Sequence, residues 1–247
     1  MKTVFLITAR LKSKRLKKKI FKEINRKPMI YYMIQRLKSI KEIDNIVICT
    51  SRTKEDYQIV DFCKKYKVDY YCGSSKDVIL RLKDASEYFN AKYIINIPAD
   101  NPLVDPIYIK KTISLIKTDK YDLIRNYSIP IGLFCYGMTL RSLKKVCDIK
   151  KSNLTEVWYK YYSETQYFKI FDIKPIKKHS EFKARLTVDY IEDFLLIKKV
   201  ILYFKKNLNF NINDLIKYFK KFPKDLNINK HLNQKTKSRY IKQSAIK

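Results

Sequence analysis

The sequence predicts an α/β fold in which a mostly parallel β-sheet is covered by helices on both faces. Short continuous apolar runs, typical of strands buried on both faces, recur through the first half of the chain. Segments with apolar residues at helical spacing separate these runs. This alternation favours a parallel sheet, because each parallel strand pair needs a crossover connection. The 247 residues suffice for a single α/β domain with a large core.

The first half of the chain alternates strands and helices in order. The predicted strands are residues 4–7, 46–49, 69–72 and 93–97. The predicted helices are residues 29–37, 57–66 and 78–88, and a fourth helix that Pro106 opens. Asp105 precedes this proline and fits a helix N-cap, so we assign it a structural role.

The second half is less regular. We expect strands at residues 123–126 and 131–136, and helices at residues 140–147, 156–162 and 194–204. Residues 185–189 fit a strand that joins the sheet late in the chain. From about residue 227 the chain is polar and basic, without apolar periodicity. We therefore predict one domain over residues 1–226 and a basic C-terminal tail over residues 227–247.

The chain is strongly basic, with 54 Lys and Arg against 24 Asp and Glu and a net charge of +30. Such a balance is typical of nucleic-acid-binding proteins. However, the lysines are spread along the whole chain, which is also rich in Ile, Asn and Tyr. All four residue types have A/T-rich codons, so genome composition explains much of the excess. We therefore do not favour nucleic acid as the main partner.

Several classes of site and location are excluded or disfavoured by composition. Only 3 glycines are present, which excludes a P-loop or a G-x-G-x-x-G phosphate loop. The five cysteines, at positions 49, 63, 72, 135 and 147, have neither C-x-x-C nor zinc-site spacing, so we expect free thiols in a reducing compartment. The N-terminal apolar run is too short for a signal peptide, and no stretch of about 20 apolar residues could span a membrane. We expect a cytoplasmic protein.

The loop after the first predicted strand concentrates positive charge. In an open parallel sheet, ligands bind at the carboxyl ends of the strands. Residues 10–19 hold seven cations: Arg10, Lys12, Lys14, Arg15, Lys17, Lys18 and Lys19. Arginine grips phosphate oxygens in bidentate fashion and lysine acts as a point charge, so the loop suits a nucleoside triphosphate. The alternative is a solvated basic loop in a lysine-rich chain.

Two aspartates follow other predicted strands at the same edge of the sheet. Asp100 follows the strand at residues 93–97, and Asp189 ends the segment at residues 185–189. Two carboxylates at neighbouring strand ends suit Mg²⁺ that bridges phosphates. The alternatives are turn formation for Asp100 and a helix N-cap for Asp189. Asp193 lies one turn into the next helix, and we assign it to the positive end of that helix.

Five motifs occur in the order and spacing of one known family. They are Thr8-Ala9-Arg10 with Ser13, Arg15-Leu16 and Lys19; Lys27-Pro28-Met29-Ile30; residues 73–81; residues 100–106; and residues 185–193. Together they resemble the cytidylyltransferases that include CMP-3-deoxy-manno-octulosonate and CMP-sialic acid synthetases. The spore-coat-polysaccharide branch is the most similar. Relatives that use UTP or GTP usually open with a glycine-rich L-A-G-G-x-G-x-R motif, whereas this chain has Thr8-Ala9-Arg10.

The resemblance implies a three-layer, Rossmann-like sheet of the nucleotide-diphospho-sugar transferase type. It implies transfer of a cytidylyl group from CTP to an acidic sugar, with Mg²⁺ as cofactor, and leaves a homodimer open. The implied catalytic residues are Arg10, Lys19 and Asp100. The implied nucleotide-binding residues are Ala9, Arg10, Ser13, Arg15, Lys19, Arg81 and Asp100. The implied substrate-binding residues are Gly132 and Arg185, and the implied metal ligands are Asp100 and Asp189.

The chain departs from the family pattern at three places. Lys17-Lys18 replaces Pro-Gly, Ala99 replaces the Gly before Asp100, and Tyr190-Ile191 replaces Thr-Pro. If the glycine position needs a positive φ, Lys18 adds strain of about 1 kcal/mol. These departures leave open a second hypothesis, a member that has lost catalysis and binds nucleic acid or acidic glycan.

Overall fold

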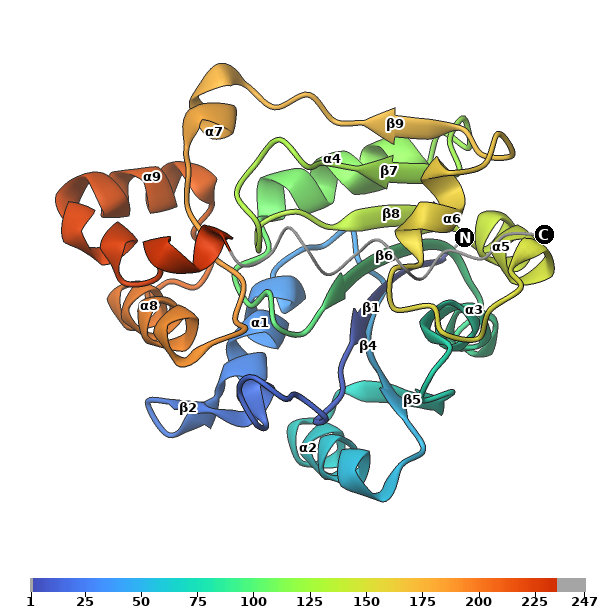
Figure 1. Cartoon of the computed structure of the whole chain (residues 1–247), viewed down its shortest axis with the longest axis horizontal. Coiled ribbons are helices and arrows are strands. Elements are labelled where there is room, and N and C mark those ends of the chain that lie inside the picture. The colour runs from blue at the N-terminus through green and yellow to red at the C-terminus, as the bar shows by residue number, and fades with distance from the viewer. Residues whose placement is uncertain (1, 235–247) are drawn as a thin grey trace.

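A seven-stranded sheet with the strand order β5-β4-β1-β6-β8-β7-β9 forms the centre of the protein (Figure 1). The computed structural model describes residues 2–234. Strands β1 and β4, β1 and β6, β4 and β5, and β7 and β9 pair in parallel, whereas β8 is antiparallel to both β6 and β7. The predicted mostly parallel α/β fold is confirmed. The strands are β1 (Lys2–Thr8), β4 (Asn45–Ser51), β5 (Asp69–Gly73), β6 (Ala91–Pro98), β7 (Leu123–Arg125), β8 (Tyr136–Thr139) and β9 (Ile170–Asp172).

Helices cover both faces of the sheet and create two apolar cores. Successive side chains of β1 point to opposite faces, so Val4 and Leu6 join one core while Phe5 and Ile7 join the other. The first core includes α3 (Val78–Tyr88), α5 (Leu140–Ile149) and α6 (Tyr159–Ser163). The second includes α1 (Met29–Lys38), α2 (Tyr57–Tyr66), α4 (Pro106–Ile116), α8 (Ile191–Tyr203) and α9 (Ile212–Lys221). This arrangement is the predicted three-layer architecture.

Asp105 has the structural role that the sequence predicts. Its Oδ1 accepts hydrogen bonds from the backbone N–H groups of Ile107 at 2.9 Å and Tyr108 at 3.2 Å, at the start of α4. Its Oδ2 accepts from the N–H of Ile212 at 2.5 Å, which fixes the start of α9 against the same helix. Burial raises the pKa of Asp105, although these three N–H groups and Arg36 oppose the shift.

A small hairpin near the N-terminus was not predicted. It pairs β2 (Glu23–Ile24) with β3 (Lys27–Pro28). Its turn residues Asn25 and Arg26 have φ angles of 47° and 60°, the left-handed conformation that a two-residue hairpin turn requires. The sequence gives little sign of this turn, because Arg26 stands where glycine is usual. The remaining elements are α7 (Lys177–Glu181) and the short helices η1 (Lys19–Phe21), η2 (Lys54–Asp56), η3 (Pro223–Asn227) and η4 (Lys230–Gln234).

Three predicted elements in the second half need correction. Residues 185–189 are not a strand, because their backbone N–H groups bond to two separate loops. The N–H of Leu186 donates to Ile131 O at 2.9 Å, and that of Val188 donates to Asp100 O at 2.8 Å. The strand predicted at residues 131–136 begins only at Tyr136, and the helix predicted at residues 156–162 begins only at Tyr159.

Packing continues beyond residue 226, where the sequence predicts that the domain ends. Leu232 is buried, and the buried Asn229 donates to Arg185 O at 2.9 Å and to Asp193 Oδ1 at 2.8 Å. The predicted tail over residues 227–247 is therefore packed against the domain as far as Leu232. Its last part, residues 235–247, lies outside the described residues.

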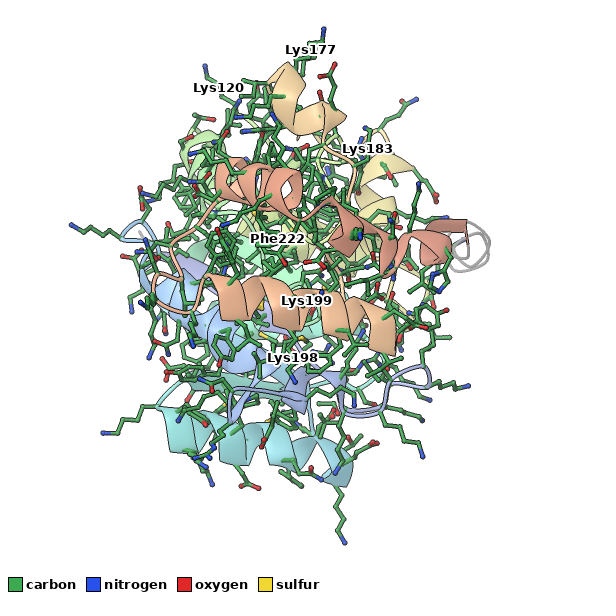
Figure 2. All side chains as sticks on the ribbon, turned by 90° about the vertical axis from the view of Figure 1, so that its left-hand side faces the viewer. Lys120, Lys177, Lys183, Lys198, Lys199 and Phe222 are labelled. Atoms are coloured by element: carbon green, nitrogen blue, oxygen red, sulfur yellow. The ribbon has the colours of Figure 1, made fainter. Side chains whose placement is uncertain are left out.

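Surface lysines come from many separate elements. On the side that Figure 2 shows, Lys120 follows α4, Lys177 lies in α7 and Lys198 lies in α8. Their spread over this side agrees with a compositional origin of the charge. Among residues 2–234, no helix has the length and apolar character needed to cross a membrane.

Candidate active site

Backbone hydrogen bonds bring the three predicted site segments together at the carboxyl ends of β1 and β6. The N–H of Ala99, after β6, donates to Thr8 O at the end of β1 at 2.9 Å. The N–H of Val188 donates to Asp100 O at 2.8 Å, which joins the third segment to the second. Ala9 is buried and donates to Cys49 O at 3.0 Å. The basic loop and both aspartates therefore meet at one edge of the sheet, as the sequence predicts.

Lys19 lies between the two predicted metal ligands. Its Nζ donates to Asp100 Oδ2 at 2.5 Å, to Asp189 Oδ1 at 3.0 Å and to the backbone oxygen of Val188 at 2.8 Å. The side chains of Lys19 and Asp189 are each 13% exposed and that of Asp100 is 22% exposed. One oxygen of each carboxylate and the backbone oxygen of Val188 therefore surround a single position, which the positively charged Lys19 Nζ occupies.

Electrostatics favour the charged forms of Lys19 and Asp189. Burial lowers the pKa of Lys19, but attraction to Asp100 and Asp189 exceeds this effect and the pKa is raised overall. Burial raises the pKa of Asp189, but Lys19, Arg15 and Arg185 exceed this effect and the pKa is lowered overall. Both shifts favour the charged forms, so we expect the ion pairs to persist around neutral pH.

Asp189 does not cap the helix that follows it, which removes one alternative left open by the sequence. The N-cap of α8 is Tyr190. Asp193 Oδ2 accepts from the N–H groups of Asp189 at 2.9 Å and Tyr190 at 3.1 Å, so Asp193 serves the helix start as predicted. The Asp189 side chain instead pairs with Lys19, with Arg15 at 2.7 Å and with Arg185 at 3.1 Å.

Arg185 is buried, which differs from the expected contact with substrate. Its side chain is 1% exposed, and its Nε donates to Asp193 Oδ1 at 2.9 Å. Its Nη2 donates to Asp189 Oδ2 at 3.1 Å. Arg185 is held by Asp193 and donates to Asp189, so it orients the Asp189 carboxylate from the buried side of the site.

Arg81 is also buried, beneath the loop that follows β5. Its Nη1 donates to Ser74 O at 2.6 Å, and its residue exposure is 1%. A Cβ at Gly73 would lie 2.8 Å from Arg81 Cγ, so the side chain passes close against this glycine. Arg81 therefore supports the loop 74–77, where the sequence led us to expect a direct nucleotide contact.

Arg10, two residues after the end of β1, reaches the same loop. Its Nη1 donates to Ser75 O at 2.9 Å, and its Nη2 pairs with the carboxylate of Glu156. The Arg10 side chain is 32% exposed, so it is accessible to a ligand. Sequence reasoning missed Glu156 as a site residue, because it lies outside every family motif, at the start of the helix predicted at residues 156–162.

The remaining residues of the basic loop differ in exposure. The Arg15 side chain is 34% exposed and its guanidinium lies 5.1 Å from the centre of the Tyr190 ring, whereas Ser13 is half-buried. Lys14 and Lys17 are exposed. Lys18 has a φ of 49°, which confirms that the family's glycine position needs a left-handed residue here.

Gly132 makes a close backbone approach to the segment that leads to Asp189. Its φ is +101°, and a Cβ at this position would lie 2.3 Å from both the carbonyl carbon and the oxygen of Leu186. The approach is consistent with the hydrogen bond between Leu186 N and Ile131 O. The absence of a side chain at Gly132 thus allows the backbone of residues 131–132 to pack against the segment that leads to Asp189.

We expect Gly132→Ala to destabilise the protein by about 2–4 kcal/mol, from the strained φ and the clash with backbone. Urea unfolding measures this loss. The neighbouring Ile131→Ala is the control, because Ile131 is 39% exposed and should cost less than about 1 kcal/mol. A loss below about 1 kcal/mol for Gly132→Ala would show that the loop can move away from Leu186.

Comparison with known proteins gives a consistent result. The profile of the cytidylyltransferase family matches residues 4–246. The chain is 31% identical over 238 residues to an uncharacterized protein of Methanocaldococcus jannaschii, covering 96% of this chain and 98% of that protein. It is 26% identical over 206 residues to the spore coat polysaccharide biosynthesis protein SpsF of Bacillus subtilis, covering 79% of this chain and 84% of that protein.

A solved structure supports the same assignment. The structure of a cytidylyltransferase from Leptospira borgpetersenii aligns with a TM-score of 0.84 at 28% identity, covering 98% of this chain and 100% of that chain. The family resemblance carried by the five motifs is confirmed. The chain belongs to the cytidylyltransferase family and is a CTP-dependent nucleotidyltransferase.

Proposed function

We propose that this protein transfers the cytidylyl group of CTP to an acidic sugar, giving a CMP-sugar and pyrophosphate for surface polysaccharide or glycoconjugate synthesis. The observation that carries the proposal is the convergence of Arg10, Arg15 and Lys19 with Asp100 and Asp189 at one edge of the sheet. The cations suit a triphosphate. The motifs that resemble those of CMP-sugar synthetases support CTP as the nucleotide and an acidic sugar as the acceptor.

In this reaction the anomeric hydroxyl of the sugar attacks the α-phosphorus in line, and pyrophosphate leaves. The protein forms no covalent bond to the substrates in this displacement, so it contributes by positioning them and by neutralising charge. Arg10 and Lys19 bind the triphosphate, with Ala9, Ser13 and Arg15 beside them. Arg81 and Arg185 act as positioning residues, one beneath the loop 74–77 and the other behind Asp189.

The two aspartates fit a divalent cation. The three atoms around Lys19 Nζ are all oxygens, the donor type that Mg²⁺ prefers, and one or two carboxylates with phosphate oxygens make its usual site. Asp100 and Asp189 would hold Mg²⁺, which when bound would neutralise phosphate charge. Among the described residues no group of three or more His, Cys, Asp or Glu forms a metal site, so water and triphosphate would complete the shell.

The sugar side of the site is proposed from position alone. Gly132 lies beside the segment that carries Asp189, and we propose that the sugar binds near it. The cytoplasm is the proposed compartment, which agrees with the five free thiols. A homodimer is part of the same proposal.

The experiment that tests this function is pyrophosphate release by the purified protein with Mg²⁺, each of four nucleoside triphosphates and a panel of acidic sugars. We expect CTP to exceed UTP, GTP and ATP in kcat/KM by at least about tenfold. The Thr8-Ala9-Arg10 opening, in place of the glycine-rich one, is the reason for this preference. Equal or better use of UTP or GTP would contradict it. Salt-dependent binding of nucleic acid without any turnover would favour the binding-protein hypothesis instead.

A further inference from the structure

Glu156 faces the phosphate-binding side of the site but carries the same sign of charge as the nucleotide. In the structure it pairs with Arg10, the residue to which we assign triphosphate binding. We propose that Glu156 competes with the triphosphate for Arg10 and so weakens the binding of both CTP and pyrophosphate. This inference rests on the proposed function, because it needs Arg10 to bind phosphate.

The backbone next to Glu156 is fixed to the start of α3. Asp77, which is 1% exposed, accepts from Leu80 N at 3.1 Å as the N-cap and from Thr155 Oγ1 at 2.8 Å. Lys150 Nζ also donates to Asp77, and Ile79 N donates to Thr155 Oγ1 at 3.0 Å. Residues 150–155 are therefore anchored from both ends, and Glu156 stays beside Arg10 without having to help hold the segment.

The pair between Arg10 and Glu156 can open at small cost. The side chain of Glu156 is 56% exposed and that of Arg10 is 32% exposed, so water screens their attraction. The contacts that anchor this segment are made by Lys150 and Thr155, so the Glu156 side chain can leave Arg10 without breaking them. Arg10 would still be oriented by Ser75 O, at 2.9 Å from its Nη1. Glu156 thus acts as a competitor that must release Arg10 before phosphate binds there.

Glu156 differs in this respect from the two aspartates of the site. Asp100 and Asp189 are mostly buried, and both are proposed to hold the cation that binds the nucleotide. Removing either should harm the reaction. Removing the charge of Glu156 should instead favour nucleotide binding, because it abolishes both the competition for Arg10 and the repulsion of phosphate.

We expect Glu156→Gln to bind CTP about two- to fivefold more tightly than the parent protein in calorimetry, the range that a weak exposed ion pair supports. KM for CTP should fall and inhibition by pyrophosphate should strengthen by similar factors, without a rise in kcat. The difference should shrink at high salt. The control is Glu164→Gln, which removes the same charge at the C-cap of α6, where Glu164 pairs with Lys160 at 3.4 Å. We expect this control to match the parent protein.

A second variant pair makes the test specific to Arg10. In an Arg10→Ala background, Glu156→Gln should no longer tighten CTP binding appreciably, because the residue for which Glu156 and the triphosphate compete is absent. Equal or weaker CTP binding by Glu156→Gln than by the parent protein would overturn the inference and leave the proposed function standing. If the parent protein itself binds no CTP and releases no pyrophosphate, the proposed function fails and the inference fails with it.

Discussion

Replacing either of the two aspartates that we propose as metal ligands is expected to abolish turnover. For Asp100→Ala and Asp189→Ala we expect kcat to fall by at least about a hundredfold, the loss typical of removing one preorganised charged group from a reaction centre. Both carboxylates hold the cation position that Lys19 Nζ marks. Pyrophosphate release at saturating CTP and sugar measures the effect.

The two variants should remain folded but differ in stability. Asp100 pairs with Lys19 at the open edge, whereas Asp189 also contacts the buried guanidinium of Arg185. We therefore expect Asp189→Ala to lose more stability, although Arg185 keeps its bonds to Asp193. Thermal unfolding separates this loss from the loss of turnover.

Two further measurements sharpen the test. Asp119→Asn is the matched control, because Asp119 is 47% exposed and pairs with Lys92 at the surface. Its turnover should be that of the parent protein. Binding of Mn²⁺ in the presence of CTP, followed by electron paramagnetic resonance, should weaken in both site variants. Parent-like turnover in Asp100→Ala would contradict the metal assignment.

Elements with strong local signals could be predicted from the sequence. The strands at residues 4–7 and 46–49 are continuous apolar runs, and the strand at residues 93–97 is apolar except for Asn96, because helices cover both faces of the sheet. Asp105 and Pro106 mark the start of α4 through bonds to adjacent residues. The left-handed φ of Lys18 could be considered in advance only through the family resemblance, because the family has a glycine at that position.

Features that depend on distant packing could not be predicted. Residues 185–189 have the composition of a strand, but their partners are two loops that only the folded chain brings close. From sequence alone, an arginine near aspartates could either bind phosphate or form a buried ion pair. Arg185 forms a buried ion pair, because Asp193 in α8 lies next to it. Glu156 reaches Arg10 across 146 positions of sequence, so no local pattern could reveal that contact.

Individual cations of the basic loop are expected to differ sharply in their effect on nucleotide use. Arg10→Ala and Lys19→Ala should lower kcat/KM for CTP by roughly ten- to a hundredfold, because a hydrogen bond to a charged group contributes about 1.5–3 kcal/mol. Lys19 should show the larger loss. Its Nζ is mostly buried between Asp100 and Asp189, and removing it leaves those carboxylates without their shared cation.

The matched controls are Lys14→Ala and Lys17→Ala, which remove the same charge from the same loop at exposed positions. A lone solvated charge is screened, so each control should change kcat/KM by less than about threefold. CTP titrations of all four variants at fixed ionic strength compare them directly. If the charge of the loop mattered only as a diffuse positive field, all four variants would show similar small losses, and the residue-specific roles of Arg10 and Lys19 would be wrong. A large loss confined to Arg10 and Lys19 would instead mean that these two cations act through defined contacts and that Lys14 and Lys17 do not.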